Sequence, residues 1–161
     1  MCSQIYVVDS AFFIEEHREK IRTVYTSPKV MEEIRSLKAK LRLELFDIQV
    51  YMPSKSSISF IEKASKELGE LKLSKADLEI LALAHELNSK YNVILLSDDY
   101  SIQNLARYLG IKFRSVSKKA ISKMITWENF CLVCGKKLPL GSTSCIYCGS
   151  NDVGRRPRKR S

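Results

Sequence analysis

The 161-residue sequence lacks any apolar run approaching the roughly 18 residues that a membrane span needs. It also opens without the basic segment and long apolar stretch of a signal peptide, so we expect a cytoplasmic protein that does not contact membranes. Hydrophobic residues nevertheless make up 45% of the chain, which excludes disorder over its full length. Length and composition together predict one domain with at most a small appendage.

Acidic residues are scarce in the C-terminal part of the chain. Residues 100–161 contain 13 basic and 2 acidic residues, and residues 100–127 contain no acidic residue. Residues 1–99 contain 14 basic and 16 acidic residues, a net charge of −2, so the C-terminal part carries +11 of the chain's formal net charge of +9. This asymmetry would steer a long polyanion to the C-terminal part, although charge that only keeps the protein soluble is the alternative.

Hydrophobic patterning predicts alternating strands and helices over the first 125 residues. Apolar, β-branched runs at 5–8 and 93–96 indicate buried strands, and Gly69 is placed to end a helix in the left-handed conformation. Further strands are expected at 47–52 and 111–116, and helices at about 11–19, 27–45, 57–68, 74–89, 101–109 and 117–125. This order predicts an α/β sandwich with a mostly parallel sheet between helices.

Composition divides the chain into three parts. Residues 1–125 carry the α/β pattern, and residues 126–150 are rich in cysteine, glycine and turn residues. Residues 151–161 are polar and end in a basic run, so we expect a disordered tail there.

Two copies of the motif C-x-x-C-G lie in the middle part, at Cys131 to Gly135 and at Cys145 to Gly149. Cys131, Cys134, Cys145 and Cys148 satisfy tetrahedral zinc completely, and each glycine supplies the positive φ that such a turn needs. The sequence therefore predicts a structural zinc site, whose metal would supply folding energy for a segment too short to form its own core. A disulfide pair would need an oxidising compartment, and redox chemistry would explain only one of the two pairs.

Acidic residues follow the two predicted buried strands. Asp9 comes after the first strand, and Asp98 and Asp99 follow the second, at the sheet edge where open α/β sheets form sites. Glu33 and Asp77 could complete a site for Mg²⁺ or Mn²⁺, since these ions prefer carboxylate oxygens. Structural roles remain open for most of them: Asp77 as a capping residue with Ser74, Asp98 or Asp99 as a turn or N-cap, and Glu33 as a solvated helix residue paired with Lys29 or Lys40. Glu32 is the alternative to Glu33 at the site.

The segments VVDSAFF, EEI, ADLEILALA and VILLSDDYSIQNLA occur in an order that resembles a PIN domain, the metal-dependent ribonuclease fold. With the four-cysteine ribbon that follows, the whole chain resembles the Nin-one-binding endonucleases of archaea and eukaryotes. That family matures the 3′ end of small-subunit ribosomal RNA.

The resemblance implies a catalytic quartet of Asp9, Glu33, Asp77 and Asp99, with Asp98 as the alternative to Asp99. These carboxylates would hold one or two Mg²⁺ or Mn²⁺ ions for phosphodiester hydrolysis, which would leave a 5′-phosphate and a 3′-hydroxyl. The implied partners are precursor small-subunit rRNA, the precursor of the small ribosomal subunit and other ribosome assembly factors.

Basic residues of the C-terminal part are candidates for contacts with the RNA backbone. Candidates for base stacking are Tyr100, Trp127, Phe130 and Tyr147, although Trp127 has packing between the two domains as its alternative role. The basic candidates are Arg107, Lys112, Arg114, Lys118, Lys119, Lys123, Lys136, Lys137, Arg155 and Arg156. A non-catalytic RNA-binding assembly factor that keeps this fold is the main alternative, and an aspartyl phosphatase is disfavoured because Asp9-Ser10-Ala11 lacks the second aspartate of that motif.

Overall fold

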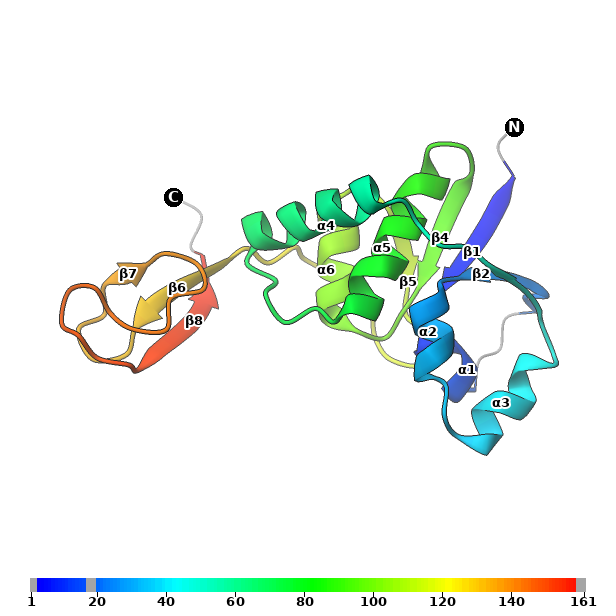
Figure 1. The fold of residues 1–161 in the computed structure, drawn as a ribbon, viewed down its shortest axis with the longest axis horizontal. Helices are drawn as coiled ribbons and strands as arrows, with labels where there is room; N and C mark the ends of the chain where they lie inside the picture. Colours follow the sequence, from blue (N-terminus) through cyan, green and yellow to red (C-terminus); the bar gives the residue numbers. More distant parts are fainter. Residues whose placement is uncertain (1–2, 17–19, 159–161) are drawn as a thin grey trace.

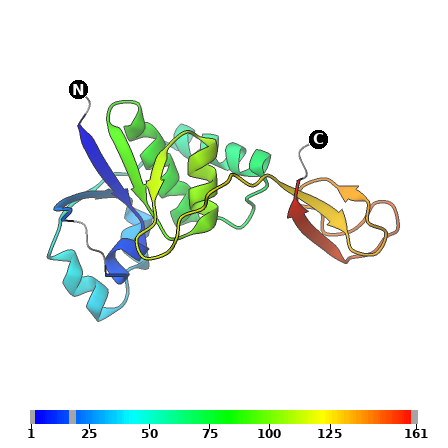
Figure 2. The same ribbon diagram turned by 180° about the vertical axis from the view of Figure 1, so that it is seen from behind.

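The computed structural model describes residues 3–16 and 20–158, which form a parallel sheet flanked by helices and a smaller antiparallel sheet. The smaller sheet projects from one end of the larger part (Figure 1), and the view from behind shows the same arrangement (Figure 2). This confirms the predicted α/β fold with a C-terminal ribbon. Within the described residues, no helix is both long and apolar enough to cross a membrane.

The larger sheet reverses its strand order beside its first strand. Its spatial order is β3-β2-β1-β4-β5, all parallel, and Val8 lies beside Leu96 at the carboxyl ends of the two central strands. Its strands are β1 (Gln4–Val8), β2 (Thr23–Thr26), β3 (Asp47–Val50), β4 (Asn92–Leu96) and β5 (Lys112–Arg114). Open α/β sheets bind ligands at such a reversal, so a site is expected at the carboxyl ends of β1 and β4.

Both faces of this sheet are buried, which explains the continuous apolar runs in β1 and β4. Val7 and Leu95 belong to one hydrophobic core, and their neighbours Val8 and Leu96 belong to a second core that also contains Phe12. Alternate residues of each strand point to opposite faces, so one core lies on each side of the sheet.

Six helices of the described chain flank the sheet, and their predicted caps are present. The Ser74 hydroxyl accepts a hydrogen bond from the backbone N–H of Asp77, and the Asp77 carboxylate accepts one from the N–H of Ser74. Gly69 ends its helix at φ 81°, in the left-handed region. The helices are α1 (Ser10–Ile14), α2 (Pro28–Glu33), α3 (Leu37–Leu43), α4 (Lys55–Leu68), α5 (Lys75–Asn88) and α6 (Tyr100–Tyr108).

The long helix predicted over 27–45 is two helices, α2 and α3. The Ser36 hydroxyl accepts a hydrogen bond from the backbone N–H of Ala39 and starts α3 as its N-cap. A serine side chain that caps a new helix competes with continuation of the preceding helix. The apolar residues keep helical spacing across this break, so the sequence pattern did not reveal it. Strand β2 was also missed, and the helix expected over about 11–19 ends at Ile14, with residues 17–19 outside the described part.

The basic helix predicted over 117–125 is wrong, because this described segment contains no helix. Side chains from α6 satisfy its backbone instead: Gln103 Oε1 accepts from Ile121 N–H at 2.9 Å, and Asn104 Oδ1 accepts from Ile125 N–H at 2.8 Å. These tertiary hydrogen bonds replace the intrahelical ones, so local propensity is overridden.

The ribbon continues into the predicted disordered tail. Strand β8 (Val153–Pro157) pairs with β6 (Trp127–Cys131), whose other edge pairs with β7 (Lys137–Leu138). The Arg155 guanidinium lies 4.2 Å from the centre of the Trp127 ring, and Arg156 lies 4.5 Å from that of Phe130. The prediction of disorder was therefore wrong for 153–157, since basic side chains stack on aromatic ones there. Residues 159–161 lie outside the described residues.

Candidate active site and metal centre

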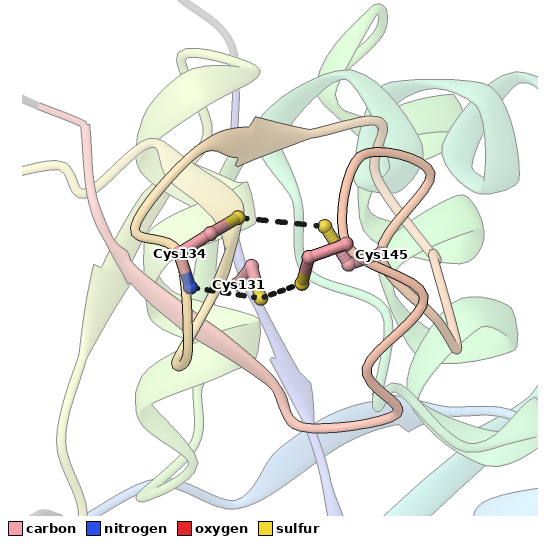
Figure 3. Close-up of side chains that lie close together, drawn as sticks. Cys131, Cys134 and Cys145 are labelled. Carbon is pink, nitrogen blue, oxygen red and sulfur yellow. Dashed lines mark hydrogen bonds between the residues drawn. The ribbon is translucent and has the colours of Figure 1, made fainter.

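The four cysteines of the ribbon lie together. Their sulfur atoms all lie within 4.8 Å of one another, and the Cys131–Cys148 and Cys134–Cys145 sulfur pairs are both 3.6 Å apart. Figure 3 shows Cys131, Cys134 and Cys145 converging, with the backbone N–H of Cys134 donating to the Cys131 sulfur at 3.4 Å. The predicted cysteine cluster is confirmed.

This cluster fits one closed tetrahedral metal site. Sulfurs at about 2.3 Å from one ion would lie roughly 3.8 Å apart, close to the spacing seen here. Burial opposes ionisation of Cys145, but backbone N–H groups of Cys148 and Tyr147 outweigh it and lower the pKa of that thiol to about 6. Gly135 and Gly149 have φ of 72° and 74°, as the two turns require. A backbone hydrogen bond favours ionisation of Cys148, but the neighbouring cysteine sulfurs outweigh it and raise the pKa of that thiol to about 11, so a metal ion would have to displace its proton. The geometry of the four cysteines fits a metal ion.

Asp9 occupies the reversal point of the parallel sheet, directly after β1. Its Oδ1 accepts from the backbone N–H of Ala11 at 2.9 Å and caps α1, and the residue is only 8% exposed. Burial raises its pKa to about 7, and the charges of Asp98 and Asp77 add to the shift, while hydrogen bonds from Ser97 and Ala11 oppose it. A carboxyl in this state binds a proton or a cation readily.

Glu33 lies within the electrostatic field of Asp77, although the two residues belong to different helices. Burial raises the pKa of Asp77, and the Asp99 charge adds to this effect against its hydrogen bonds with Ser74. The pKa of the exposed Glu33 is raised by partial desolvation and by Asp77. Lys29 pairs with Glu32 at 3.9 Å, so the competing glutamate has a cationic partner of its own.

Asp98 has a structural role that distinguishes it from its neighbour. Its carboxylate accepts hydrogen bonds from the hydroxyls of Ser115 and Ser117, both at 2.6 Å, and from the backbone N–H groups of residues 116–118. Burial opposes ionisation, but these hydrogen bonds prevail and lower its pKa to about 2. Both oxygens are therefore engaged in holding the chain that follows β5.

Asp99 uses only one of its oxygens. Its Oδ1 caps α6 by accepting from the N–H groups of Ser101 at 2.7 Å and Ile102 at 3.2 Å. The second oxygen of this exposed residue accepts no hydrogen bond from the described chain. Asp99 therefore has an oxygen available to a cation, which Asp98 lacks.

These acids fit a divalent cation by their chemistry. Asp9, Asp77 and Asp99 each hold a helix start with a carboxylate. The charge of Asp77 raises the pKa of Asp9, and the charge of Asp99 raises the pKa of Asp77. Only the cysteines, among residues the structure describes, bring three or more potential ligand atoms within 4.8 Å of one another. A bound cation would offset the repulsion that keeps such carboxylates apart, and hard oxygen donors suit Mg²⁺ or Mn²⁺.

Sequence reasoning missed Glu79, which positions two of these acids. It is 2% exposed, and its Oε2 accepts from the backbone N–H of Lys29 at 2.8 Å, at the start of α2. This contact ties α2, which carries Glu33, to α5, which carries Asp77. An acidic residue within the apolar run of α5 was the available signal, because buried acids are rare unless they have a partner.

Comparison with known proteins identifies the family. A family described as "PIN domain of ribonuclease" matches residues 6–87. Endoribonuclease Nob1 of Pyrococcus abyssi is 40% identical over 152 residues, which cover 89% of this chain and 89% of that protein. Endoribonuclease Nob1 of Archaeoglobus fulgidus is 33% identical over 157 residues, covering 96% and 93% respectively. The chain belongs to the Nob1 family of PIN-domain endoribonucleases.

The Nob1 resemblance extends to a eukaryotic relative over a shorter segment. The 20S-pre-rRNA D-site endonuclease NOB1 of Saccharomyces cerevisiae is 36% identical over 76 residues. This match covers 44% of the present chain and 17% of the yeast protein.

The basic candidate residues of the chain differ in their position and contacts. Lys112 bonds to Asn92 at the amino end of β4, on the opposite edge of the sheet from Asp9. Lys137 and Arg156 both pair with Glu128, at 3.6 Å and 2.9 Å. Lys118, Lys119 and Lys123 are exposed in the segment between β5 and β6, and Lys136 lies over Tyr147. Arg107, in α6, donates to the carbonyl of Ile121, and Arg114 is exposed at the end of β5.

A buried carboxylate joins the ribbon to the parallel-sheet domain. Glu70 is 3% exposed, and its Oε1 accepts from the Trp127 indole N–H at 2.8 Å and from the Asn104 amide at 2.7 Å. Its Oε2 accepts no hydrogen bond and faces the Arg155 guanidinium at 3.8 Å. Trp127 and Arg155 therefore hold the junction between the two domains.

Proposed function

We propose that this endoribonuclease cleaves precursor small-subunit rRNA at its 3′ end during ribosome biogenesis. The catalytic residues in this proposal are Asp9, Glu33, Asp77 and Asp99, holding Mg²⁺ or Mn²⁺, and the ribbon cysteines hold structural zinc. The names of the Pyrococcus and yeast relatives support the reaction and the substrate class. The precursor of the small ribosomal subunit and its assembly factors are the proposed partners, and the cytoplasm is the proposed location.

One observation carries the proposal: the buried Asp9 lies at the reversal point of the sheet, and its ionisation is coupled to Asp77. If Asp9 only capped α1, its carboxylate would not need to be buried. A carboxylate that binds a cation benefits from burial, because opposite charges attract more strongly away from water. The second carboxylate oxygen of Asp99 supplies a further potential cation ligand at the carboxyl end of the adjacent strand, β4.

The residues of the chain have separable tasks in this reaction. Asp9 must lose its proton to act as a ligand, and burial sets the pKa of that loss at about 7. When bound there, Mg²⁺ or Mn²⁺ makes water nucleophilic near neutral pH and neutralises the charge that develops on the scissile phosphate. Asp98 and Glu79 keep the surrounding backbone in place, and the basic segment after β5 attracts the phosphates of the strand.

Mapping of cleavage ends tests this function. A precursor RNA that spans the 3′ end of the small-subunit rRNA is incubated with the protein and Mn²⁺ or Mg²⁺, and both new ends are identified. We expect one cut, with a 5′-phosphate and a 3′-hydroxyl, and a rate at least about a hundredfold lower with Asp9→Asn.

The matched control is Asp47→Asn, an exposed acid at the amino end of β3, which should cut at the wild-type rate. If Asp9→Asn cuts as fast as wild type, the assignment of the site is wrong. If RNA binds and no divalent ion yields a cut, the non-catalytic assembly factor replaces the nuclease.

A further inference from the structure

A cavity of about 500 Å³ opens next to the start of α6. It is lined by Tyr100 and by residues 119–123 and Ile125 of the segment between β5 and β6. Tyr100 directly follows Asp99, so the cavity begins beside the proposed catalytic acids. Figure 2 shows the segment, in yellow, running alongside α6.

Buried polar side chains hold this wall of the cavity in a fixed, non-helical shape. Gln103 is fully buried and bonds both to the backbone of Ser97 and to that of Ile121, at 2.7 Å and 2.9 Å. Asn104 forms two hydrogen bonds with the backbone of Ile125, both 2.8 Å long. The Arg107 guanidinium donates to the carbonyl of Ile121 at 3.1 Å. A wall anchored at these points is preorganised, which lowers the entropic cost of binding.

The lining combines an aromatic ring, aliphatic side chains and cations. Tyr100 is 53% exposed, and its ring has no stacking partner among the described residues. Lys119 and Lys123 are exposed and form no ion pair with a described acid, in a segment that lacks acidic residues. An occupant that matches this lining has a flat apolar face and a negative charge.

We propose that this cavity, called here the Tyr100 pocket, binds one unpaired nucleotide of the RNA, next to the scissile phosphate. Its base stacks on Tyr100, and Lys119 and Lys123 contact phosphates. A base inside a duplex has both faces covered, so the pocket selects single-stranded RNA at this point. The proposal rests on the proposed function, because the reaction supplies the RNA whose cut lies beside Asp99.

Binding of uncut RNA tests the pocket independently of cleavage. A single-stranded RNA of the precursor sequence is titrated in buffer without added Mg²⁺ or Mn²⁺ and without a chelator, so that no cut occurs and the ribbon keeps its metal. A series of the same RNA carries one abasic position at each site in turn. Wild type should lose affinity roughly five- to a hundredfold at one abasic position, the range for one base stacked on an aromatic ring. Tyr100→Leu should bind the intact RNA that much more weakly and show no sensitive position.

Matched controls separate stacking and charge from general damage. Tyr91→Leu removes a tyrosine that is 38% exposed at the opposite edge of the sheet, and it should bind like wild type. The double change Lys119→Ala with Lys123→Ala should make the slope of log K against log salt shallower by about 1.4, or about 0.7 for each lost contact. Lys55→Ala with Lys63→Ala, on α4, should leave the slope unchanged.

The outcomes distinguish the pocket from the nuclease function. If wild type and Tyr100→Leu respond alike to every abasic position, the pocket assignment is wrong, even though cleavage persists. If the expected abasic pattern appears in a protein that cuts no RNA with any divalent ion, the pocket stands and the proposed function fails. Equal loss of affinity for RNA and for an acidic peptide in Tyr100→Leu would point to a protein partner and overturn the proposal.

Discussion

Asp98 and Asp99 are adjacent and chemically identical, but the structure gives them different tasks. Asp98 engages both oxygens with the segment after β5, whereas Asp99 caps α6 with one oxygen. We therefore expect Asp98→Asn to destabilise the fold and Asp99→Asn to abolish cleavage in a stable protein. Each change replaces one carboxylate oxygen with an amide, so the two variants form a matched pair.

The magnitude for Asp98 follows from its pKa, which is lowered from 3.8 to about 2 in a site that is 9% exposed. Each pKa unit corresponds to about 1.4 kcal/mol, so ionised Asp98 contributes roughly 2–3 kcal/mol to the free energy of unfolding. Asparagine would also turn N–H donors toward the donors of Ser117. Asparagine is as good an N-cap as aspartate, so Asp99→Asn should change stability by less than about 0.5 kcal/mol.

Urea denaturation at several pH values measures this difference. A carboxyl with a lowered folded pKa stabilises the protein above its unfolded pKa of about 3.9, and that contribution is lost as the pH falls toward about 2. The stability gap between wild type and Asp98→Asn should therefore be full at pH 7 and shrink below about pH 4.

The opposite pattern would refute the reasoning. If Asp99→Asn were the destabilised variant and Asp98→Asn were a stable, inactive protein, the two roles would be exchanged. A gap for Asp98→Asn that stayed constant from pH 7 to pH 2 would show that the lost contacts do not depend on its charge.

Three further predictions concern other parts of the molecule. Burial of Asp9 raises its pKa to about 7, so the metal-free wild-type protein should lose stability as the pH rises from about 4 to 7. Above pH 7, Asp9→Asn should be more stable than wild type by up to about 4 kcal/mol, because it has no buried charge at this position. Thermal melts at several pH values measure both effects. Glu70→Leu leaves the Trp127 and Asn104 donors without their acceptor, which should cost roughly 2–4 kcal/mol and expose the junction to limited proteolysis. Glu67→Leu, at an exposed position of α4, should not have this effect. A strong chelator should unfold the ribbon while the parallel sheet stays folded, which NMR signals from the backbone amides of each domain would show. Unfolding of both domains together would contradict a metal that stabilises the ribbon alone.

The sequence was sufficient for features encoded locally. Apolar runs placed β1 and β4, the Ser74 capping box and Gly69 placed helix ends, and the repeated cysteine motif predicted the metal cluster. Each of these features depends on residues that are neighbours in the chain, so spacing alone carries the information.

Features that depend on tertiary partners escaped prediction. The segment 117–125 has the composition of a basic helix, but Gln103 and Asn104 take its backbone hydrogen bonds. The local sequence of the tail is polar and basic, which is typical of disorder. Strand β8 is nevertheless stabilised by pairing with β6 and by stacking of Arg155 on Trp127, which the local sequence does not reveal. The choice between Asp98 and Asp99 likewise required knowing which donors surround each carboxylate.

The central claim is that carboxylates at the carboxyl ends of β1 and β4 cut precursor rRNA. Mapping of cleavage ends, with Asp9→Asn and Asp99→Asn compared at saturating RNA, tests it most directly. The account predicts one cut that leaves a 5′-phosphate and a 3′-hydroxyl, with its rate reduced at least a hundredfold in both variants, on the order of what loss of a charge-stabilising group costs. Cleavage by both variants at the wild-type rate would contradict it.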